Sequence, residues 1–300
     1  MKERRHIYTP IFASVIILLI MLMKLIDASV LNRENEYVAI ILLECVIFAI
    51  PGIIFTRLTG RRDDKVIKMA PLRSNTILIL LLAVLSLISG SILYGYLVSS
   101  FSSGVNVAFN LYDVFTAKYA DSVGEVLYLV LAYALIPAFF EEFTFRGIIF
   151  ARYEALSPLY SVIMSSVMFA FIHLDYVMLP FYIFAGLILA IVLYSVDSVF
   201  ITVAVHFLYN LFFLFCPLYI NSIYSSGKEI LLFISGVVFF GSLSFLCAEC
   251  RKVFRRKAET EPNPPDRSKR SGRSVSFLEV ILSPTAIICY LVYFAAVVIF

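Results

Sequence analysis

Residues 75–98 read NTILILLLAVLSLISGSILYGYLV, a stretch that contains no charged side chain and is long enough for a helix to cross the hydrocarbon core of a bilayer. The same character extends through the chain, because 61% of its 300 residues are hydrophobic, 15% are charged and the mean hydropathy is +0.95. Soluble globular domains are much more polar than this. The composition therefore excludes an ordinary water-soluble protein and predicts a membrane protein.

Eight further apolar blocks are similar to residues 75–98, which predicts an all-α fold: a polytopic membrane helix bundle of about eight or nine transmembrane helices. Their approximate ranges are 11–30, 38–56, 126–153, 159–174, 177–195, 199–215, 229–249 and 277–300. The first block follows a basic leader, as in a signal peptide. Its length of about twenty residues favours an uncleaved first helix, with a cleaved signal as the alternative.

The chain is predicted to contain a polytopic membrane domain at 1–257, a linker at 258–276 and a C-terminal hydrophobic helix at 277–300. The linker is rich in proline, serine and charge, which is typical of a disordered segment, here placed in the cytoplasm. Pro284 interrupts the last block, so its sequence leaves open whether that block crosses the membrane.

Basic residues indicate the orientation of the predicted helices. A cytoplasmic N-terminus places nearly all of the 24 Lys and Arg residues on the inner side, as the positive-inside rule requires. The exceptions are Arg33, Lys118 and Lys228 on the outer side and Lys24 and Arg146 within the membrane. We therefore expect a multi-pass protein of a bacterial-type cell membrane, with the lipid bilayer as a partner. The net charge of +3 and the lack of basic segments interleaved with aromatics give no support for a nucleic-acid partner.

Charged residues inside such helices indicate a specific role, since each raises the free energy of membrane insertion by roughly 2.5–3.5 kcal/mol at a helix centre. Residues 138–147, AFFEEFTFRG, hold two acids and a base. Glu142 and Arg146 are four residues apart and are predicted to pair, whereas Glu141 is rotated by about 100° and is left to act as a general base. The alternative is a purely structural ion network of all three. Glu44, in the second block, is another buried acid, which is predicted to pair with a neighbouring helix, with a position facing the cavity as the alternative.

Two histidines lie in later blocks. His173 ends the run FAFIH, and His206 opens the run HFLYN, so that Asn210 follows one turn later on the same face. An isolated buried histidine is usually a packed, hydrogen-bonded residue. Two of them in one membrane domain with a Glu-Glu pair favour a functional site.

The spacing around the predicted turns tests whether these residues lie at the same depth. Glu141 and His173 are each 16 residues from Ser157, in the turn between the fourth and fifth blocks. Both residues are therefore about 24 Å from this turn along antiparallel helices, so they are predicted to lie opposite each other. His206 is nine residues from the next turn at Asp197, about 13 Å along its helix, and fits this level less well.

Such a set of side chains has the chemistry for peptide-bond hydrolysis without a covalent nucleophile. A carboxylate and an imidazole can deprotonate water, while a second imidazole and a carboxamide can donate hydrogen bonds to the oxyanion. Alternatively, Glu141, His173 and His206 are a ligand set for a divalent metal such as zinc, with one position left open. The residues alone do not separate the two mechanisms. The signature motifs of serine hydrolases, zincins and P-loop ATPases are absent from the sequence.

Three short motifs on successive predicted helices resemble those of the CPBP family, which comprises type II CAAX prenyl endopeptidases and bacterial Abi proteins of bacteriocin processing and self-immunity. They are Glu141-Glu142-x-x-x-Arg146, Phe169-x-x-x-His173 and His206-x-x-x-Asn210. The resemblance covers about residues 125–215. Phe184-Ala185-Gly186 is also similar to the family's pattern.

The resemblance implies an intramembrane glutamic endopeptidase that cleaves a membrane protein or a lipidated or hydrophobic peptide. It implies that Glu141 and His173 activate water and that His206 and Asn210 stabilise the oxyanion, with Glu142, Arg146 and Phe169 as supporting residues. The name metalloprotease is often used for this family, and a metal cofactor stays open. The alternative function is a non-catalytic membrane protein, such as a bacteriocin immunity factor or a small-solute or proton transporter, that uses the same buried polar residues for binding.

Overall fold

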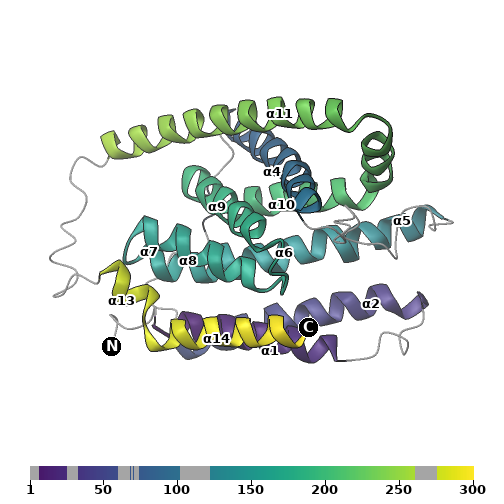
Figure 1. Ribbon diagram of the computed structural model, residues 1–300. Coiled ribbons are helices and arrows are strands. Elements are labelled where there is room, and N and C mark those ends of the chain that lie inside the picture. The colour runs from purple at the N-terminus through teal and green to yellow at the C-terminus, as the bar shows by residue number, and fades with distance from the viewer. Residues whose placement is uncertain are drawn as a thin grey trace.

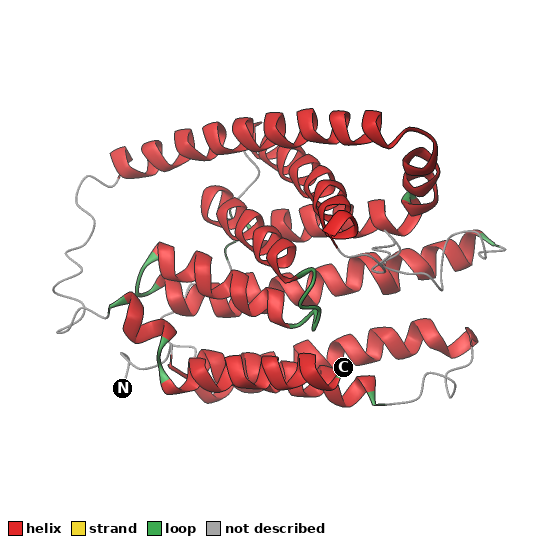
Figure 2. Ribbon diagram, viewed as in Figure 1, coloured by secondary structure: helices red, strands yellow, loops and turns green. Residues whose placement is uncertain are grey.

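The computed structural model describes residues 7–25, 33–59, 68, 70, 74–101, 122–260 and 276–300. Within these ranges the regular elements are helices, as Figure 2 shows. Five of them are long and apolar enough to cross a membrane, and four shorter apolar helices accompany them. Each falls on one of the predicted blocks. The predicted all-α, polytopic fold is confirmed, and the chain is a multi-pass membrane protein.

The helices are numbered along the chain in Figure 1. Their bounds are α1 Thr9–Lys24, α2 Arg33–Glu44, α3 Ile50–Thr59, α4 Ser74–Phe101, α5 Val123–Val130, α6 Ile136–Glu142, α7 Phe150–Glu154, α8 Pro158–Phe171, α9 Leu179–Val196, α10 Val199–Phe215, α11 Pro217–Thr260, α13 Phe277–Ile281 and α14 Pro284–Ile299. Three π-helical segments continue between them without a break: η3 Cys45–Ala49, η5 Leu131–Leu135 and η6 Phe143–Ile149.

The outward face of α11 identifies the solvent of the bundle. Five large apolar side chains at spacings of three and four residues are 54% to 72% exposed on it: Ile230, Phe233, Ile234, Val237 and Phe240. A continuous apolar stripe of this kind is unfavourable in water but matches hydrocarbon. The stripe therefore faces lipid.

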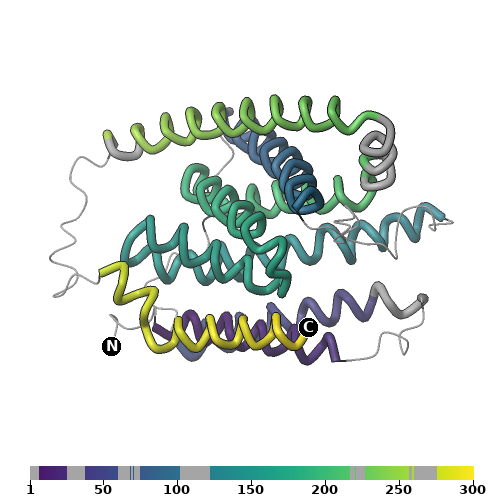
Figure 3. The backbone as a smooth tube through the Cα atoms, viewed as in Figure 1, coloured from purple at the N-terminus to yellow at the C-terminus, as the bar shows by residue number. Residues whose placement is uncertain are grey.

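The helices far apart in sequence pack together at two edges of the bundle. The helix α11 lies along α4 at one edge, and α1 and α14 lie side by side at the other, although they come from opposite ends of the colour bar in Figure 3. Between these edges lie α8, α9 and α10, with α6 packed against α10. The central layer carries the candidate site.

The C-terminal block differs from the single helix predicted at 277–300. Pro284 begins a new helix, α14, whose N-cap Ser283 accepts a hydrogen bond from the backbone N–H of Ala286 at 3.3 Å. Proline is favoured at this first position because it needs no hydrogen-bond acceptor there. Most of the linker predicted at 258–276 lies outside the described residues, and α11 extends to Thr260.

Both predicted turns around the site are confirmed. Ser157 has an extended backbone and accepts a hydrogen bond from the N–H of Leu159 at 3.3 Å, so it caps α8, and Pro158 opens the helix. Asp197 ends α9 in the left-handed conformation, with φ of 53°.

Lys68 fastens these two turns together. Its Nζ lies 2.6 Å from Oε1 of Glu154, at the end of α7, and 3.0 Å from Oδ1 of Asp197. The backbone adds two hydrogen bonds: the N–H of Val199 donates to the carbonyl of Lys68, and the N–H of Ala70 donates to the carbonyl of Asp197, each at 2.9 Å. We call this arrangement the Lys68 clasp. It fixes the ends of the helices that carry the site.

The π-helical segments bracket the buried acids. Glu44 immediately precedes η3, and the Glu141-Glu142 pair lies in α6, between η5 and η6. Such segments are rare and are frequent at functional sites, because the wider turn changes the direction of the side chains around it. Their position directs attention to these carboxylates.

Candidate active site

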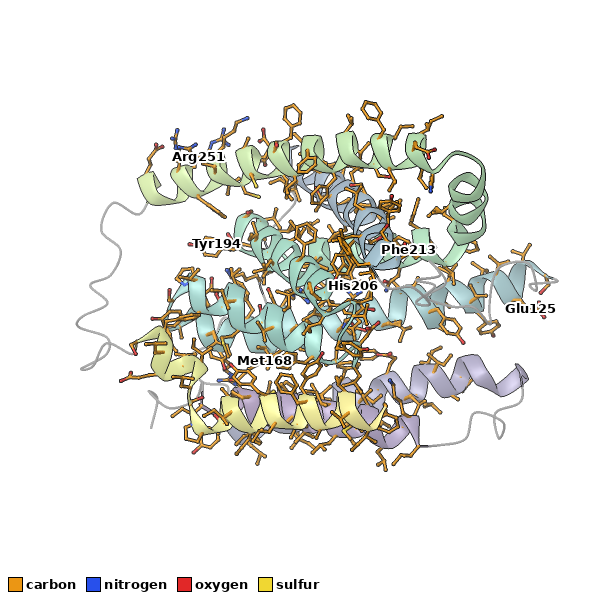
Figure 4. All side chains as sticks on the ribbon, viewed as in Figure 1. Glu125, Met168, Tyr194, His206, Phe213 and Arg251 are labelled. Atoms are coloured by element: carbon orange, nitrogen blue, oxygen red, sulfur yellow. The ribbon has the colours of Figure 1, made fainter. Side chains whose placement is uncertain are left out.

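Glu142 is the centre of a buried ion network. Its Oε1 accepts a hydrogen bond from Nη1 of Arg146 at 2.9 Å, and both side chains are fully enclosed. Nδ1 of His206, on α10, lies 3.2 Å from the same oxygen. The predicted pairing of Glu142 with Arg146 is confirmed, and the network joins α6, η6 and α10. Figure 4 shows His206 in the crowded interior of the molecule.

The second arm of the Arg146 guanidinium reaches α9. Its Nη2 donates to the backbone carbonyl of Gly186 at 3.1 Å. Gly186 packs directly on α8, since a Cβ added there would meet Cα of Ser166 at 2.8 Å. Gly186 belongs to the Phe184-Ala185-Gly186 pattern in the sequence, but nothing in that pattern indicates that its carbonyl binds the arginine.

Phe169 is the aromatic contact that links the polar residues. The guanidinium carbon of Arg146 lies 4.3 Å from the centre of its ring, a cation–π arrangement. The rings of His173 and His206 lie edge-on to it, at centroid distances of 5.1 and 5.8 Å. The predicted supporting residue therefore touches one side chain from each of the three motifs.

His173 follows the end of α8 and is held on two sides. Its Nδ1 lies 3.1 Å from the backbone carbonyl of Phe169, and its ring stacks on Tyr182 with centroids 3.9 Å apart. Because a carbonyl oxygen only accepts, Nδ1 carries the hydrogen, and Nε2 of the neutral ring keeps its lone pair. The ring also lies close enough to His206 for the two imidazoles to interact electrostatically. The sequence gave no signal for Tyr182.

Asn210 lies one turn after His206 on α10. Its Nδ2 donates to the backbone carbonyl of Ala134 at 3.4 Å, which connects α10 to the π-helical segment η5. This long hydrogen bond anchors the carboxamide. It leaves the carboxamide beside the histidine network without a direct bond to it.

Glu141 faces a different neighbour from its companion Glu142. Its Oε2 is buried and has no hydrogen-bond partner among the described residues, and the same holds for Oε2 of Glu44. The two carboxylates lie close enough to interact electrostatically. Glu44, predicted to pair with a neighbouring helix, thus interacts with another acid on the neighbouring helix α6. The sequence marked Glu44 as a buried acid but could not show what it faces.

The described donors do not fit a metal centre. No group of three His, Cys, Asp or Glu side chains in the described part of the chain lies close enough to hold an ion. Instead, His206 is engaged by Glu142, and Nδ1 of His173 is engaged by a backbone carbonyl. The trio Glu141, His173 and His206 does not converge on one point, and no step below uses a metal.

An apolar cavity of about 690 Å³ lies next to this network, between η3 and α3 on one wall and α6 and η6 on the other. Aromatic and aliphatic side chains form most of its surface, and Arg57 and Arg152 lie at its wall. Phe140 and Thr144 line it from α6 and η6, while Glu141, next to Phe140, does not. Cavities of this size hold one hydrophobic chain or ligand.

The structure thus joins the predicted residues in two groups. Glu142, Arg146, His206, Phe169 and His173 form one connected cluster, and Glu141 stands beside it with Glu44 as its partner. Asn210 is one helical turn from His206 and bonds to η5. The catalytic roles of Glu141, His173, His206 and Asn210 stay predictions.

Residues 123–212 match the family model described as Rce1-like: Type II CAAX prenyl endopeptidase Rce1-like. The match covers nearly the whole segment predicted at 125–215, so the predicted resemblance is confirmed over that segment. All three motifs lie inside it. Comparisons with curated proteins and with solved structures found no match.

Proposed function

We propose that this Rce1-like chain is an intramembrane endopeptidase that hydrolyses a peptide bond of a membrane-associated protein or peptide, with Glu141 as the base. At the level of the family, residues 123–212 support a CAAX-type intramembrane protease. The observation that carries the proposal is the buried Oε2 of Glu141, which no described residue satisfies, next to the Glu142–Arg146–His206 network. A buried polar atom in this state is a binding site for water.

Water activation is assigned to Glu141 and His173. Glu141 accepts a proton from a water molecule as the water oxygen attacks the substrate carbonyl carbon. Nε2 of His173, which keeps its lone pair because Nδ1 donates to Phe169, accepts a hydrogen bond from the second O–H of that water and so orients it. No covalent intermediate with the protein is needed.

Oxyanion stabilisation is assigned to His206 and Asn210. Glu142 binds Nδ1 of His206, so the ring presents Nε2 on its other side, and an N–H at Nε2 donates a hydrogen bond to the oxyanion. Nδ2 of Asn210 supplies a second donor once substrate displaces its long bond to Ala134. Arg146 holds Glu142 in place through its hydrogen bond to Oε1.

The surroundings favour a hydrophobic substrate that enters from the membrane. The apolar cavity lies beside α6, within one residue of Glu141, and accepts a lipidated or apolar part of such a substrate. The match to a CAAX prenyl endopeptidase family makes a prenylated CAAX peptide the first substrate to test. We also propose that the N-terminus lies in the cytoplasm, which follows from the distribution of basic residues.

The test uses the full chain reconstituted in liposomes. A prenylated CAAX peptide, the same peptide without its lipid, and an unrelated transmembrane peptide are incubated with the wild type and with Glu141→Gln, and the products are identified by mass spectrometry. We expect cleavage by the wild type and a loss of at least about 100-fold in Glu141→Gln, since general-base catalysis contributes that much or more.

The control for this test is the thermal midpoint, which should be unchanged in Glu141→Gln because the amide has the shape of the carboxyl group. Cleavage of these peptides by Glu141→Gln at the wild-type rate would contradict the assignment of Glu141 as the base. A wild type that cleaves none of the peptides while it binds or transports a solute would favour the non-catalytic alternative.

A further inference from the structure

Glu44 and Glu141 form a carboxyl pair across the interface between α2 and α6. Each has a buried Oε2 with no hydrogen-bond partner in the described residues, and each lies next to a π-helical segment. The helices α2 and α6 pack against each other. Neither Oε2 accepts a hydrogen bond from a described basic side chain, although Glu141 also interacts electrostatically with Glu142 and Arg146.

The charges around this pair do not balance if every acid is ionised. Three carboxylates, those of Glu44, Glu141 and Glu142, face one guanidinium, Arg146, whose Nη1 is already bonded to Glu142. The other titratable groups nearby are His206, which binds Glu142, and His173, which binds a carbonyl. Two adjacent carboxylates in an apolar interior repel each other strongly, and a proton between them removes that repulsion.

We propose that Glu44 and Glu141 share one proton, so that Glu44 is a positioning residue that holds the base, Glu141, in its reactive form. This inference deepens the proposed function and rests on it for the role of Glu141. The protonated carboxyl of Glu44 donates a hydrogen bond to the carboxylate of Glu141, and the remaining acceptor positions of that carboxylate are left for the water molecule. The sequence-based resemblance contains no residue from α2, so Glu44 is an addition to the predicted site.

The shared proton allows a balanced hydrolysis cycle. The resting pair holds one proton, and it takes a second from water as the water oxygen bonds to the carbonyl carbon. The pair then gives one proton to the leaving nitrogen as the C–N bond breaks, and the oxyanion collapses to the new carboxyl group. The pair returns to one proton, and water is the only co-reactant.

Infrared difference spectroscopy of the purified chain in lipid, recorded in H₂O and D₂O, measures the shared proton directly. We expect the wild type to show the C=O stretch of a protonated carboxyl group near neutral pH and Glu44→Gln to lack it. Glu229→Gln, which removes an exposed acid at the start of the α11 membrane span, is the control and should keep the band. A wild type without the band, or a band that persists unchanged in Glu44→Gln, would overturn the proposal.

Kinetics provide the second arm. Glu44→Gln should lower kcat by about 100-fold and leave KM unchanged, because its amide fills the space but cannot exchange the proton, and Glu44→Asp should restore part of the loss. Full wild-type kcat in Glu44→Gln would overturn the role as a positioning residue. If Glu44→Gln does not accumulate, the infrared spectrum of Glu44→Asp is the test. A C=O band shifted from its wild-type position supports the shared proton, and an unshifted band contradicts it.

The two proposals fail in different ways. If the wild type cleaves no substrate, the proposed function fails, and the spectroscopic arm still decides whether Glu44 and Glu141 share a proton, because it needs no turnover. If the wild type cleaves and Glu141→Gln does not, but Glu44→Gln is unchanged in both band and kcat, only the inference about Glu44 fails.

Discussion

Nδ1 of His206 lies 3.2 Å from Oε1 of Glu142, and that oxygen also accepts the hydrogen bond from Arg146. One oxygen of Glu142 therefore holds both the guanidinium of Arg146, one turn later in the same helical segment, and the imidazole of His206 on α10. The arrangement separates the two adjacent acids into different tasks. Glu142 holds the neighbouring side chains in place, and Glu141 is the acid to which we assign the proposed chemistry.

This division predicts opposite behaviour for the two glutamine variants. Glu142→Gln should destabilise the chain by about 3–5 kcal/mol, because it leaves the enclosed guanidinium of Arg146 without its anion. Glu141→Gln should retain wild-type stability. Unfolding in detergent micelles, followed by circular dichroism, measures both. The double variant Glu142→Gln/Arg146→Met should be less destabilised than Glu142→Gln alone, and a larger loss would contradict the assigned pairing.

Replacement of Phe169 should affect activity more than a comparable replacement nearby. Phe169→Leu removes the ring that contacts Arg146, His173 and His206, so we expect cleavage per folded molecule to fall by about 10- to 100-fold through misplacement of these groups. Phe171, two residues later, stacks on Tyr293 of α14 instead, at a centroid distance of 4.2 Å. Phe171→Leu should therefore lower stability and spare the cleavage rate. Equal effects on cleavage would argue against Phe169 as the link.

Gly186 should not tolerate even one added carbon. Gly186→Ala places a Cβ 2.8 Å from Cα of Ser166, so α9 must move away from α8 and shift the carbonyl that binds Arg146. We expect a loss of about 1–3 kcal/mol in unfolding free energy, typical of overpacking. Gly236→Ala on α11 is the matched control, since nothing lies within 4 Å of its added Cβ. A stable Gly186→Ala would show that the two helices separate easily.

The Lys68 clasp should contribute to the free energy of unfolding, and this contribution should be lost at alkaline pH. Burial alone lowers the pKa of Lys68, but the carboxylates of Glu154 and Asp197 outweigh burial and raise that pKa above its usual value. A raised folded-state pKa gives a stabilisation that is complete below the unfolded value, about 10.4, and is lost as the pH rises through the folded value.

Lys68→Met should therefore lower the unfolding free energy by about 1 kcal/mol at neutral pH, and its difference from the wild type should vanish at strongly alkaline pH. The thermal midpoint as a function of pH measures this. Lys252→Met removes an exposed pair with Glu249 and is the control, with an expected change below about 0.5 kcal/mol. A difference that grows with pH would contradict the assigned partners.

Much of the fold could be predicted from the sequence, because membrane helices are recognised by their length and hydropathy. Each predicted block contains a helix, and the turns at Ser157 and Asp197 lie where expected. The sequence predicted neither the π-helical segments nor the start of a separate helix at Pro284. Hydropathy does not distinguish a π turn from an α turn, and a proline in an apolar block can kink a helix or start a new one.

The site was predictable in its parts but less so in its connections. The Glu142–Arg146 pair follows from spacing along one helix, so the sequence was sufficient. The contacts of His206 with Glu142 and of Glu141 with Glu44 join different helices, and no local pattern sets the rotation of one helix against another. For the same reason the sequence favoured a common point for Glu141, His173 and His206, whereas the described side chains have separate nearest partners.

The π-helical segment η6 makes the spacing of this region intolerant of length changes. Its hydrogen bonds skip one more residue than those of an α-helix, so the segment already absorbs one extra residue, and insertion of a further residue within Phe143–Ile149 would turn everything after it by about 100°. Tyr153 and Glu154 would then point away from the core and from Lys68, even though no site residue had been replaced. The number of residues in this stretch therefore shapes the candidate site as much as their identity does.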